Sequence, residues 1–257
     1  MTSTPSPAEP TLVFGTDLAG RHSSESATLA TNLYDAGVGT ASGETGYAYA
    51  IPYMNSTCEL LAPDVIRNYV DPFIARAKGT AQQKYHVARF ACEATAHSDE
   101  VMARMFADVP ANVRLPALWN RILQADAPAR LLLFDPGAHM KAAAWQDQLQ
   151  RYIDLNAPLW GSAGVEVVSF GAARVVVAND VACKRIGVTH RVVGLNEAFF
   201  GKNAALAAEA RAVWASTHLL SIFDFDQTGQ PSQIRILGAA QRGGLAIDQI
   251  NAKDVDG

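Results

Sequence analysis

The residues that follow the first apolar segment have the types and spacing to hold an anion. Leu12 to Gly15 is apolar, and a small-residue turn and a polar segment come next. The candidate ligand-binding residues there are Gly15, Thr16, Gly20, Arg21 and His22. Beyond a strand of an α/β protein, free N–H groups and the dipole of the next helix favour anions, and Arg21 can pair with a phosphate. The alternative is an ordinary loop capped by Ser23 or Ser24.

A glycine-rich stretch, Gly37 to Pro52, comes shortly afterwards. We take Gly43 and Gly46 as further candidate ligand-binding residues, because glycine lets the backbone approach a ligand closely. A hairpin or a surface loop without a ligand accounts for the same glycines.

Three segments in the second half of the chain are expected at the ends of strands. They are residues 169–174 (SFGAAR), Gly201 to Asn203 with Lys202, and the loop 224–232 with Thr228 and Gly229. If they converge on one crevice, Lys202, Thr228 and Gly229 would contact the ligand there. Each segment is also explained as a simple turn.

Catalytic residues cannot be assigned from spacing. The carboxylates near the candidate loops are Asp17, Glu93, Asp224 and Asp226, and no pair of them is fixed by spacing. Glu93 and His97 are four residues apart and could supply an acid or a base, or could belong to a solvated loop. The six histidines show no close pairing typical of a metal site, so we expect neither a metal nor a cofactor.

Alternating apolar patterns predict the elements that position these residues. Strands are expected at 12–15, 47–51, 85–90, 131–134, 165–169, 188–193, 219–225 and 245–247. Helices are expected at 24–34, 63–78, from Ser98 onwards, and at 142–155, 175–186, 203–216 and 232–240. Such alternation predicts an α/β fold with mostly parallel sheets. We predict a flexible tail (1–10), a first α/β domain (11–123), a linker (124–129) and a second α/β domain (130–257), each domain with three layers.

Composition narrows the class of protein. The 257 residues are 49% hydrophobic and 18% charged, which suits a globular protein with a sizeable core. A net charge of −4 gives no basic field for nucleic acid. No apolar run approaches the roughly 20 residues that cross a bilayer, and residues 1–10 lack the features of a signal peptide. Three scattered cysteines fit a reducing compartment. We therefore expect a cytoplasmic protein with no nucleic-acid or membrane partner.

The first half resembles the macro-domain-like proteins that are common in phage genomes. The matching segments are FGTDLAGRH, GETGYAYAIP, ARFACEATAHSDEVMARMF and VRLPALW, which span about residues 12–120. Macro domains bind ADP-ribose and related nucleotides, so the resemblance implies such a ligand. This sequence departs from the family pattern at Ser23, Ser24 and Glu25 and at residues 91–97, where side chains replace glycines.

The second half resembles SLOG-type Rossmann-like domains, which are associated with nucleotide-derived ligands. The matching segments are SFGAAR, GKNAALAAE and DQTGQPS. The two resemblances imply a macro-like domain followed by a Rossmann-like domain.

Three functions follow as expectations. The first is a binding module for an ADP-ribose-like or other nucleotide-derived ligand, without catalysis. The second is a phage-derived structural or assembly protein whose ligand sites have degenerated, with a homo-oligomer or a phage assembly partner, in the host cytoplasm or the virion. The third is a hydrolase of an N-glycosidic or phosphoribosyl bond.

Overall fold

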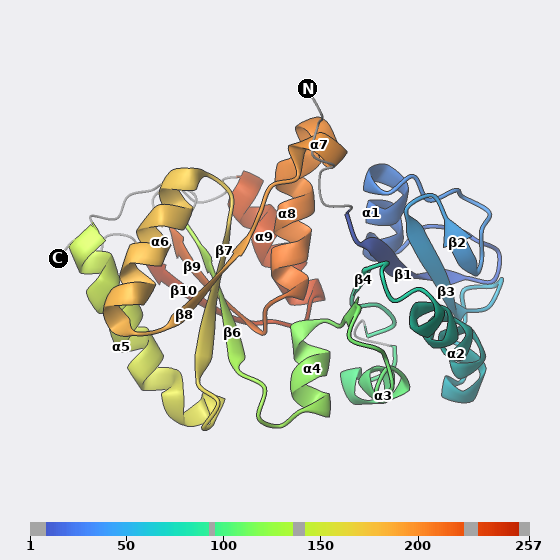
Figure 1. Ribbon diagram of the computed structural model, residues 1–257, viewed down its shortest axis with the longest axis horizontal. Coiled ribbons are helices and arrows are strands. Elements are labelled where there is room, and N and C mark those ends of the chain that lie inside the picture. The colour runs from blue at the N-terminus through green and yellow to red at the C-terminus, as the bar shows by residue number, and fades with distance from the viewer. Residues whose placement is uncertain (1–8, 93–95, 136–141, 224–230, 252–257) are drawn as a thin grey trace. The chain divides into compact units, whose positions relative to one another are not determined.

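The chain forms two compact units, each built around a five-stranded sheet. The computed structural model describes residues 9–92, 96–135, 142–223 and 231–251. Unit 1 comprises residues 1–123 and 198–201, and unit 2 comprises residues 124–197 and 202–257. Both units are α/β with mostly parallel strands, which confirms the predicted fold class (Figure 1).

The described part of unit 1 contains five strands and four helices, together with a short helix from later in the chain. The strands are β1 (Thr11–Asp17), β2 (Gly43–Thr45), β3 (Ala48–Met54), β4 (Tyr85–Val87) and β5 (Val113–Arg114). The helices are α1 (Glu25–Leu33), α2 (Pro63–Gly79), α3 (Asp99–Met105) and α4 (Ala117–Leu123). The sheet order is β2-β3-β1-β4-β5, in which only β2 is antiparallel to its neighbour. Phe199 and Phe200 of α7 (Glu197–Phe200) contact the ring of Tyr34.

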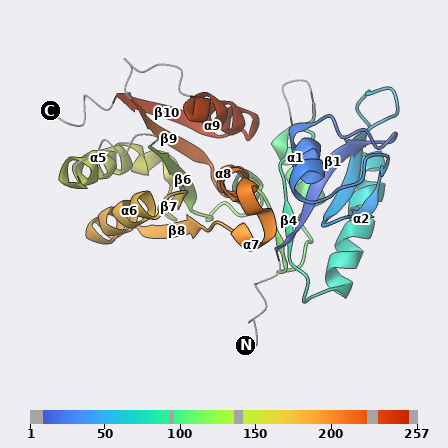
Figure 2. The ribbon, with the colours of Figure 1, turned by 90° about the horizontal axis from the view of Figure 1, so that it is seen from above.

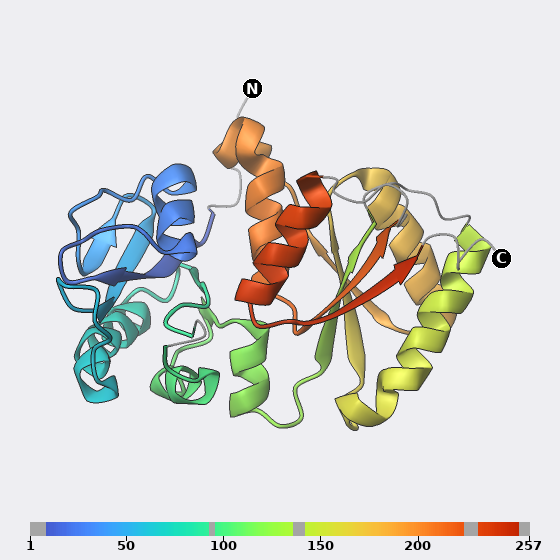
Figure 3. The same cartoon turned by 180° about the vertical axis from the view of Figure 1, so that it is seen from behind.

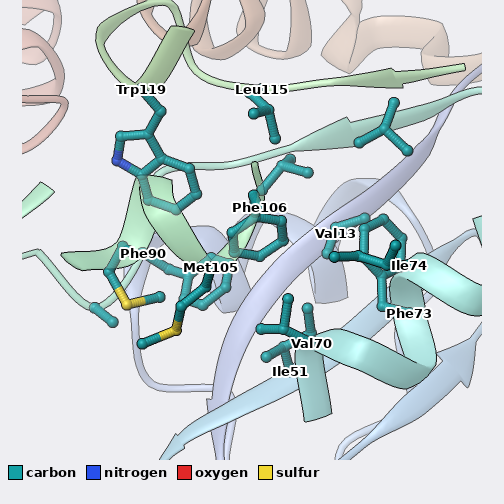
Figure 4. Packing of buried hydrophobic residues seen from close by; sticks show 14 of the residues in the cluster. Val13, Ile51, Val70, Phe73, Ile74, Phe90, Met105, Phe106, Leu115 and Trp119 are labelled. Carbon is teal, nitrogen blue, oxygen red and sulfur yellow. The ribbon is translucent and has the colours of Figure 1, made fainter. Parts of the chain in front are cut away.

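Helices cover both faces of the unit 1 sheet. Strand β1 is buried along its whole length, as expected for a central parallel strand covered on both faces. Helix α2 presents an apolar stripe that includes Val70 and Phe73 to the face that carries Val13 and Ile51 (Figure 4). Phe106 and Trp119 complete this core. The small helix α1 lies on the opposite face and buries Ala27 and Ala30.

Unit 2 is an all-parallel sheet whose strands alternate with helices. The strands are β6 (Ala129–Phe134), β7 (Val165–Phe170), β8 (Thr189–Val193), β9 (His218–Phe223) and β10 (Ala246–Asn251). The helical elements are α5 (Ala142–Trp160), α6 (Ala173–Ile186), η1 (Gly201–Asn203), α8 (Ala204–Trp214) and α9 (Pro231–Arg242). The strand order is β10-β9-β6-β7-β8.

Two separate apolar clusters hold the three layers of unit 2 together. Trp145 and Leu149 of α5 pack with Leu131 on one face, where Cys183 of α6 is also buried. On the other face, α8 and α9 contribute Ala212 and Ile236, which pack with Leu132 and its neighbours. Figures 2 and 3 show α8 and α9 on the face of the sheet opposite to α5 and α6.

Some elements differ from the sequence-based expectation. The strand expected at 85–90 ends at Val87, and Ala91 adopts a positive φ of 59° that ends the extended conformation. Apolar periodicity does not predict the short elements β2, β5, α4 and α7. Elements of two to seven residues carry too little hydrophobic pattern to be recognised. The glycine-rich stretch contains the β2–β3 hairpin, one of the two interpretations left open.

Candidate functional site

In each unit, the edge of the sheet at which the parallel strands end is called here the carboxyl edge. In unit 1 the chain passes from β1 to β3 on one side and reaches β4 on the other side. Ligands of open α/β sheets bind where the strand order reverses in this way. The segment from Gly15 to Ser24 covers the last three residues of β1 and the loop that leads to α1, which is where the sequence placed its first candidate site.

A closed polar network occupies this loop. Asp17 is fully buried; its Oδ1 accepts hydrogen bonds from the backbone N–H groups of Ala19 and Arg21, both at 2.9 Å. Its Oδ2 accepts from Nε of Arg21 at 2.7 Å, and Nη2 of Arg21 donates to the Ser56 carbonyl at 2.6 Å. The charge of Arg21 is therefore matched by a carboxylate within its own loop, which weakens its attraction for a phosphate.

This network predicts how unfolding depends on pH. Desolvation raises the pKa of Asp17, but the hydrogen bonds and charge of its partners outweigh it, and the net shift is downward. A folded-state pKa below the unfolded value of about 3.9 adds stability above that pH, and the contribution is lost as pH falls through the folded pKa. Between pH 5 and 3, the unfolding free energy of Asp17→Asn should fall less steeply than that of wild type, by up to about 1.4 kcal/mol per pH unit. Urea unfolding across this range measures the difference, and parallel curves would contradict it.

Most of the other predicted residues of this loop are also engaged by the protein. Thr16 Oγ1 donates to the Arg21 carbonyl, and Nδ1 of His22 lies 2.9 Å from the hydroxyl of Thr31. A Cβ added at Gly15 would lie 2.7 Å from the side chain of Phe90. The structure thus brings Gly15, Thr16, Arg21 and His22 together, but it uses them for local packing and hydrogen bonding.

The other candidate glycines of unit 1 do not lie together. Gly20 packs against the backbone of Gly39, whose N–H donates to the Gly20 carbonyl at 2.9 Å. Gly43 lies in β2 opposite Ala50. Gly46 lies in the β2–β3 turn at the amino end of β3, the opposite end of the sheet from Arg21. The structure therefore does not bring Gly46 to the carboxyl edge.

The helices α1, α2 and α3 start with acidic residues at this edge. Their first turns contain Glu25, Asp64, and Asp99 with Glu100, respectively. Ser24 and Ser98 also cap α1 and α3 through their hydroxyl groups. Negative side chains stabilise helix N-termini and repel an incoming phosphate. The carboxyl edge of unit 1 is thus electrostatically unsuited to an anion.

The carboxyl edge of unit 2 has the opposite character. In chain order its strands are arranged 5-4-1-2-3, the same neighbour relations as in a dinucleotide-binding sheet, with the order reversing between β6 and β9. Every helix that follows a strand of a parallel sheet starts at the carboxyl edge. The first turns of the described helices α5, α6, α8 and α9 contain no acidic residue, whereas the short helix α7, which directly follows β8, begins with Glu197.

Helices α6 and α8 also begin without a side-chain cap. Ala172 occupies the N-cap of α6 with only a methyl group, and Asn203 at the N-cap of α8 makes no capping hydrogen bond within the described residues. Exposed cations stand beside both starts, Arg174 in the first turn of α6 and Lys202 just before α8. Gly171, at φ 96°, precedes α6, and a Cβ there would meet nothing within 4 Å. The missing cap of α6 is visible in the sequence as Ala172 once the helix start is known, whereas the sequence alone would predict that Asn203 caps α8.

Several candidates cannot be placed. Thr228, Gly229, Asp224, Asp226 and Glu93 lie outside the described residues. Among the residues that are described, no group of three or more His, Cys, Asp or Glu side chains could hold a metal ion. No helix in the described ranges has both the length and the apolar character to cross a membrane.

Comparison with known proteins adds no relative to this description. No protein-family model, curated protein or solved structure matches this chain.

Proposed function

We propose that this protein is a binding module for a phosphate-bearing, nucleotide-derived ligand such as ADP-ribose, held at the carboxyl edge of unit 2. The observation that carries the proposal is the absence of acidic residues from the first turns of α5, α6, α8 and α9. The start of a helix presents N–H groups and the positive end of a dipole to a ligand. In α6 the N–H group of Val175 already donates to the Ala172 carbonyl, which leaves those of Ala173 and Arg174 for this role. The strand order favours the same place, because it reverses between β6 and β9.

In this proposal, each described residue of the site has a role. The first-turn N–H groups of α6 would donate to phosphate oxygens, and the open backbone at Gly171 would allow close approach. Arg174 and Lys202 would supply charge-assisted hydrogen bonds. We propose that binding is not followed by a reaction. The proposed likeness to SLOG-type domains points to the same class of ligand.

A scaffolding role is the second candidate, and unit 1 favours it. The ion pair of Asp17 and Arg21 and the acidic helix starts leave its carboxyl edge with hydrogen bonds already made and with negative charge. This is what a macro-like domain that retains its fold without its ligand site would look like. Sedimentation velocity tests the role: a partner-free monomer at high concentration would argue against assembly.

The binding proposal predicts specific losses of affinity. Calorimetry with ADP-ribose, NAD and cyclic nucleotides should detect binding of at least one compound, which should also raise the melting temperature. Arg174→Ala and Lys202→Ala should each weaken that binding about 10- to 100-fold, since a charge-assisted hydrogen bond contributes about 1.5–3 kcal/mol. The matched control is Arg151→Ala, which removes the same charge from an exposed position in the middle of α5. Absence of heat and of thermal shift with every compound would reject the proposal.

A further inference from the structure

A chain of hydrogen bonds connects α6 to the sheet of unit 2; the side chains of Ser169 and His190 are buried in it, and that of Asp180 is 40% exposed. Oγ of Ser169 in β7 lies 2.7 Å from Nε2 of His190 in β8. Nδ1 of His190 lies 3.4 Å from Oδ1 of Asp180 in α6. Lys184 donates a hydrogen bond to Asp180 that lowers the pKa of its carboxyl group, so Asp180 is ionised at neutral pH. An ionised Asp180 favours the His190 tautomer with the proton on Nδ1, which leaves Nε2 to accept from Ser169.

The atoms follow the order of a serine-hydrolase triad, but the burial argues against nucleophilic chemistry. Ser169 is fully buried, and the side chain of His190 is only 4% exposed. A substrate carbonyl would have to reach Oγ through the layer formed by α6. The chain of hydrogen bonds therefore needs a different explanation.

Helix α6 depends on polar contacts for its position. No residue from 173 to 178 is fully buried, and Val175 and Val176 are only half-buried, so apolar packing holds the first half of the helix weakly. The first fixed points along the helix are Asn179, whose Oδ1 accepts from Nε1 of Trp145 at 3.2 Å, and Asp180. Ser169 lies directly before the turn that leads into α6. Through His190, Ser169 at the end of β7 is thus connected to Asp180 in α6.

We propose that Asp180, His190 and Ser169 form a clamp that fixes the first half of α6 at the carboxyl edge, which makes His190 a positioning residue for the phosphate. The role in binding rests on the proposed function, whereas the clamp itself can be tested without a ligand. Loss of the acceptor at residue 180 would free α6 to move relative to β7, and the N–H groups of its first turn would no longer be held in place.

Two substitutions at one position separate the hydrogen bond from the charge. Asp180→Asn and Asp180→Ala both remove the carboxylate and its ion pair with Lys184, but only Asn keeps an oxygen that accepts from His190. Amide hydrogen exchange over residues 173–180 should be about tenfold faster in Asp180→Ala, as for an opening made easier by about one hydrogen bond. Asp180→Asn should remain within about twofold of wild type. Since alanine is the better helix former, intrinsic propensity would produce the opposite order.

The outcomes distinguish the two proposals. ADP-ribose should bind Asp180→Ala about tenfold more weakly and Asp180→Asn about as well as wild type. Equal exchange in the two variants would overturn the clamp, and labelling of Ser169 by a fluorophosphonate would overturn the assignment as a positioning device. Faster exchange with unchanged affinity would overturn its role in binding. If wild type binds no nucleotide, the proposed function fails, while the exchange experiment still decides whether the clamp exists.

Discussion

Asp99→Ala is expected to lower the unfolding free energy of unit 1 by about 3–5 kcal/mol, the usual cost of removing one partner of a largely buried ion pair. Nε and Nη2 of Arg89 donate to the two carboxylate oxygens of Asp99, both at 2.8 Å. Nε1 of Trp119 donates to the same carboxylate at 2.8 Å. The side chain of Arg89 is only 11% exposed, so the substitution leaves a cation that water cannot fully solvate.

The adjacent residue provides the control. Glu100 also lies in the first turn of α3, but its ion pair with Arg104 is exposed on both sides, at 62% and 72%. Glu100→Ala should therefore cost less than about 1 kcal/mol. Denaturant unfolding at pH 7 compares the two variants. Equal losses would mean that the helix dipole, which both carboxylates face, dominates over the Arg89–Asp99 pair.

Gly20→Ala should have the second largest effect, about 2–4 kcal/mol. Gly20 has a φ of 70°, which costs an L residue about 1–2 kcal/mol. A Cβ there would also lie 2.4 Å from the carbonyl carbon of Gly39, and this backbone atom cannot be moved by a change of rotamer. Overpacking of this kind adds about 1–3 kcal/mol.

A glycine of matched conformation isolates the contribution of packing. Gly164 has a φ of 68°, and a Cβ there would meet nothing within 4 Å. Gly164→Ala should therefore cost only the conformational part, about 1–2 kcal/mol. If Gly20→Ala folds as well as Gly164→Ala, Gly20 is not required by the packing of the loop, and its interpretation as a ligand-binding glycine regains support.

The sequence predicted the place of the first loop but not the partners of its glycines and arginine. Gly15, Gly20 and Arg21 have the types and spacing of an anion-binding loop, and the structure places this loop at the carboxyl edge. Their partners come from distant segments: Phe90 faces Gly15, and Ser56 accepts from Arg21. No local pattern indicates such partners, so the sequence could locate the loop without revealing that its groups are already engaged.

The helix starts of unit 2 show the reverse case. The absence of acidic residues from the first turns of α6 and α8, and the alanine at the N-cap of α6, can be seen in the sequence. The absence of acidic residues indicates an anion site only if these helices begin at the same edge of the sheet. The all-parallel strand order determines that they do. A turn rich in glycine and serine is a more easily recognised sequence pattern than a helix start without acidic residues, so the first loop is the stronger prediction from sequence.

The α/β class and most of the elements can be predicted from the sequence, because apolar periodicity is a local property of the chain. The tertiary structure alone decided the order of the strands, and through it the partners of Arg21, the junction of Ser169 with His190, and the edge at which α6 and α8 begin. These features depend on side chains and backbone groups that are far apart in the chain and meet only after the strands have paired. A short polar segment has the same local pattern whether it binds a ligand or another part of its own chain.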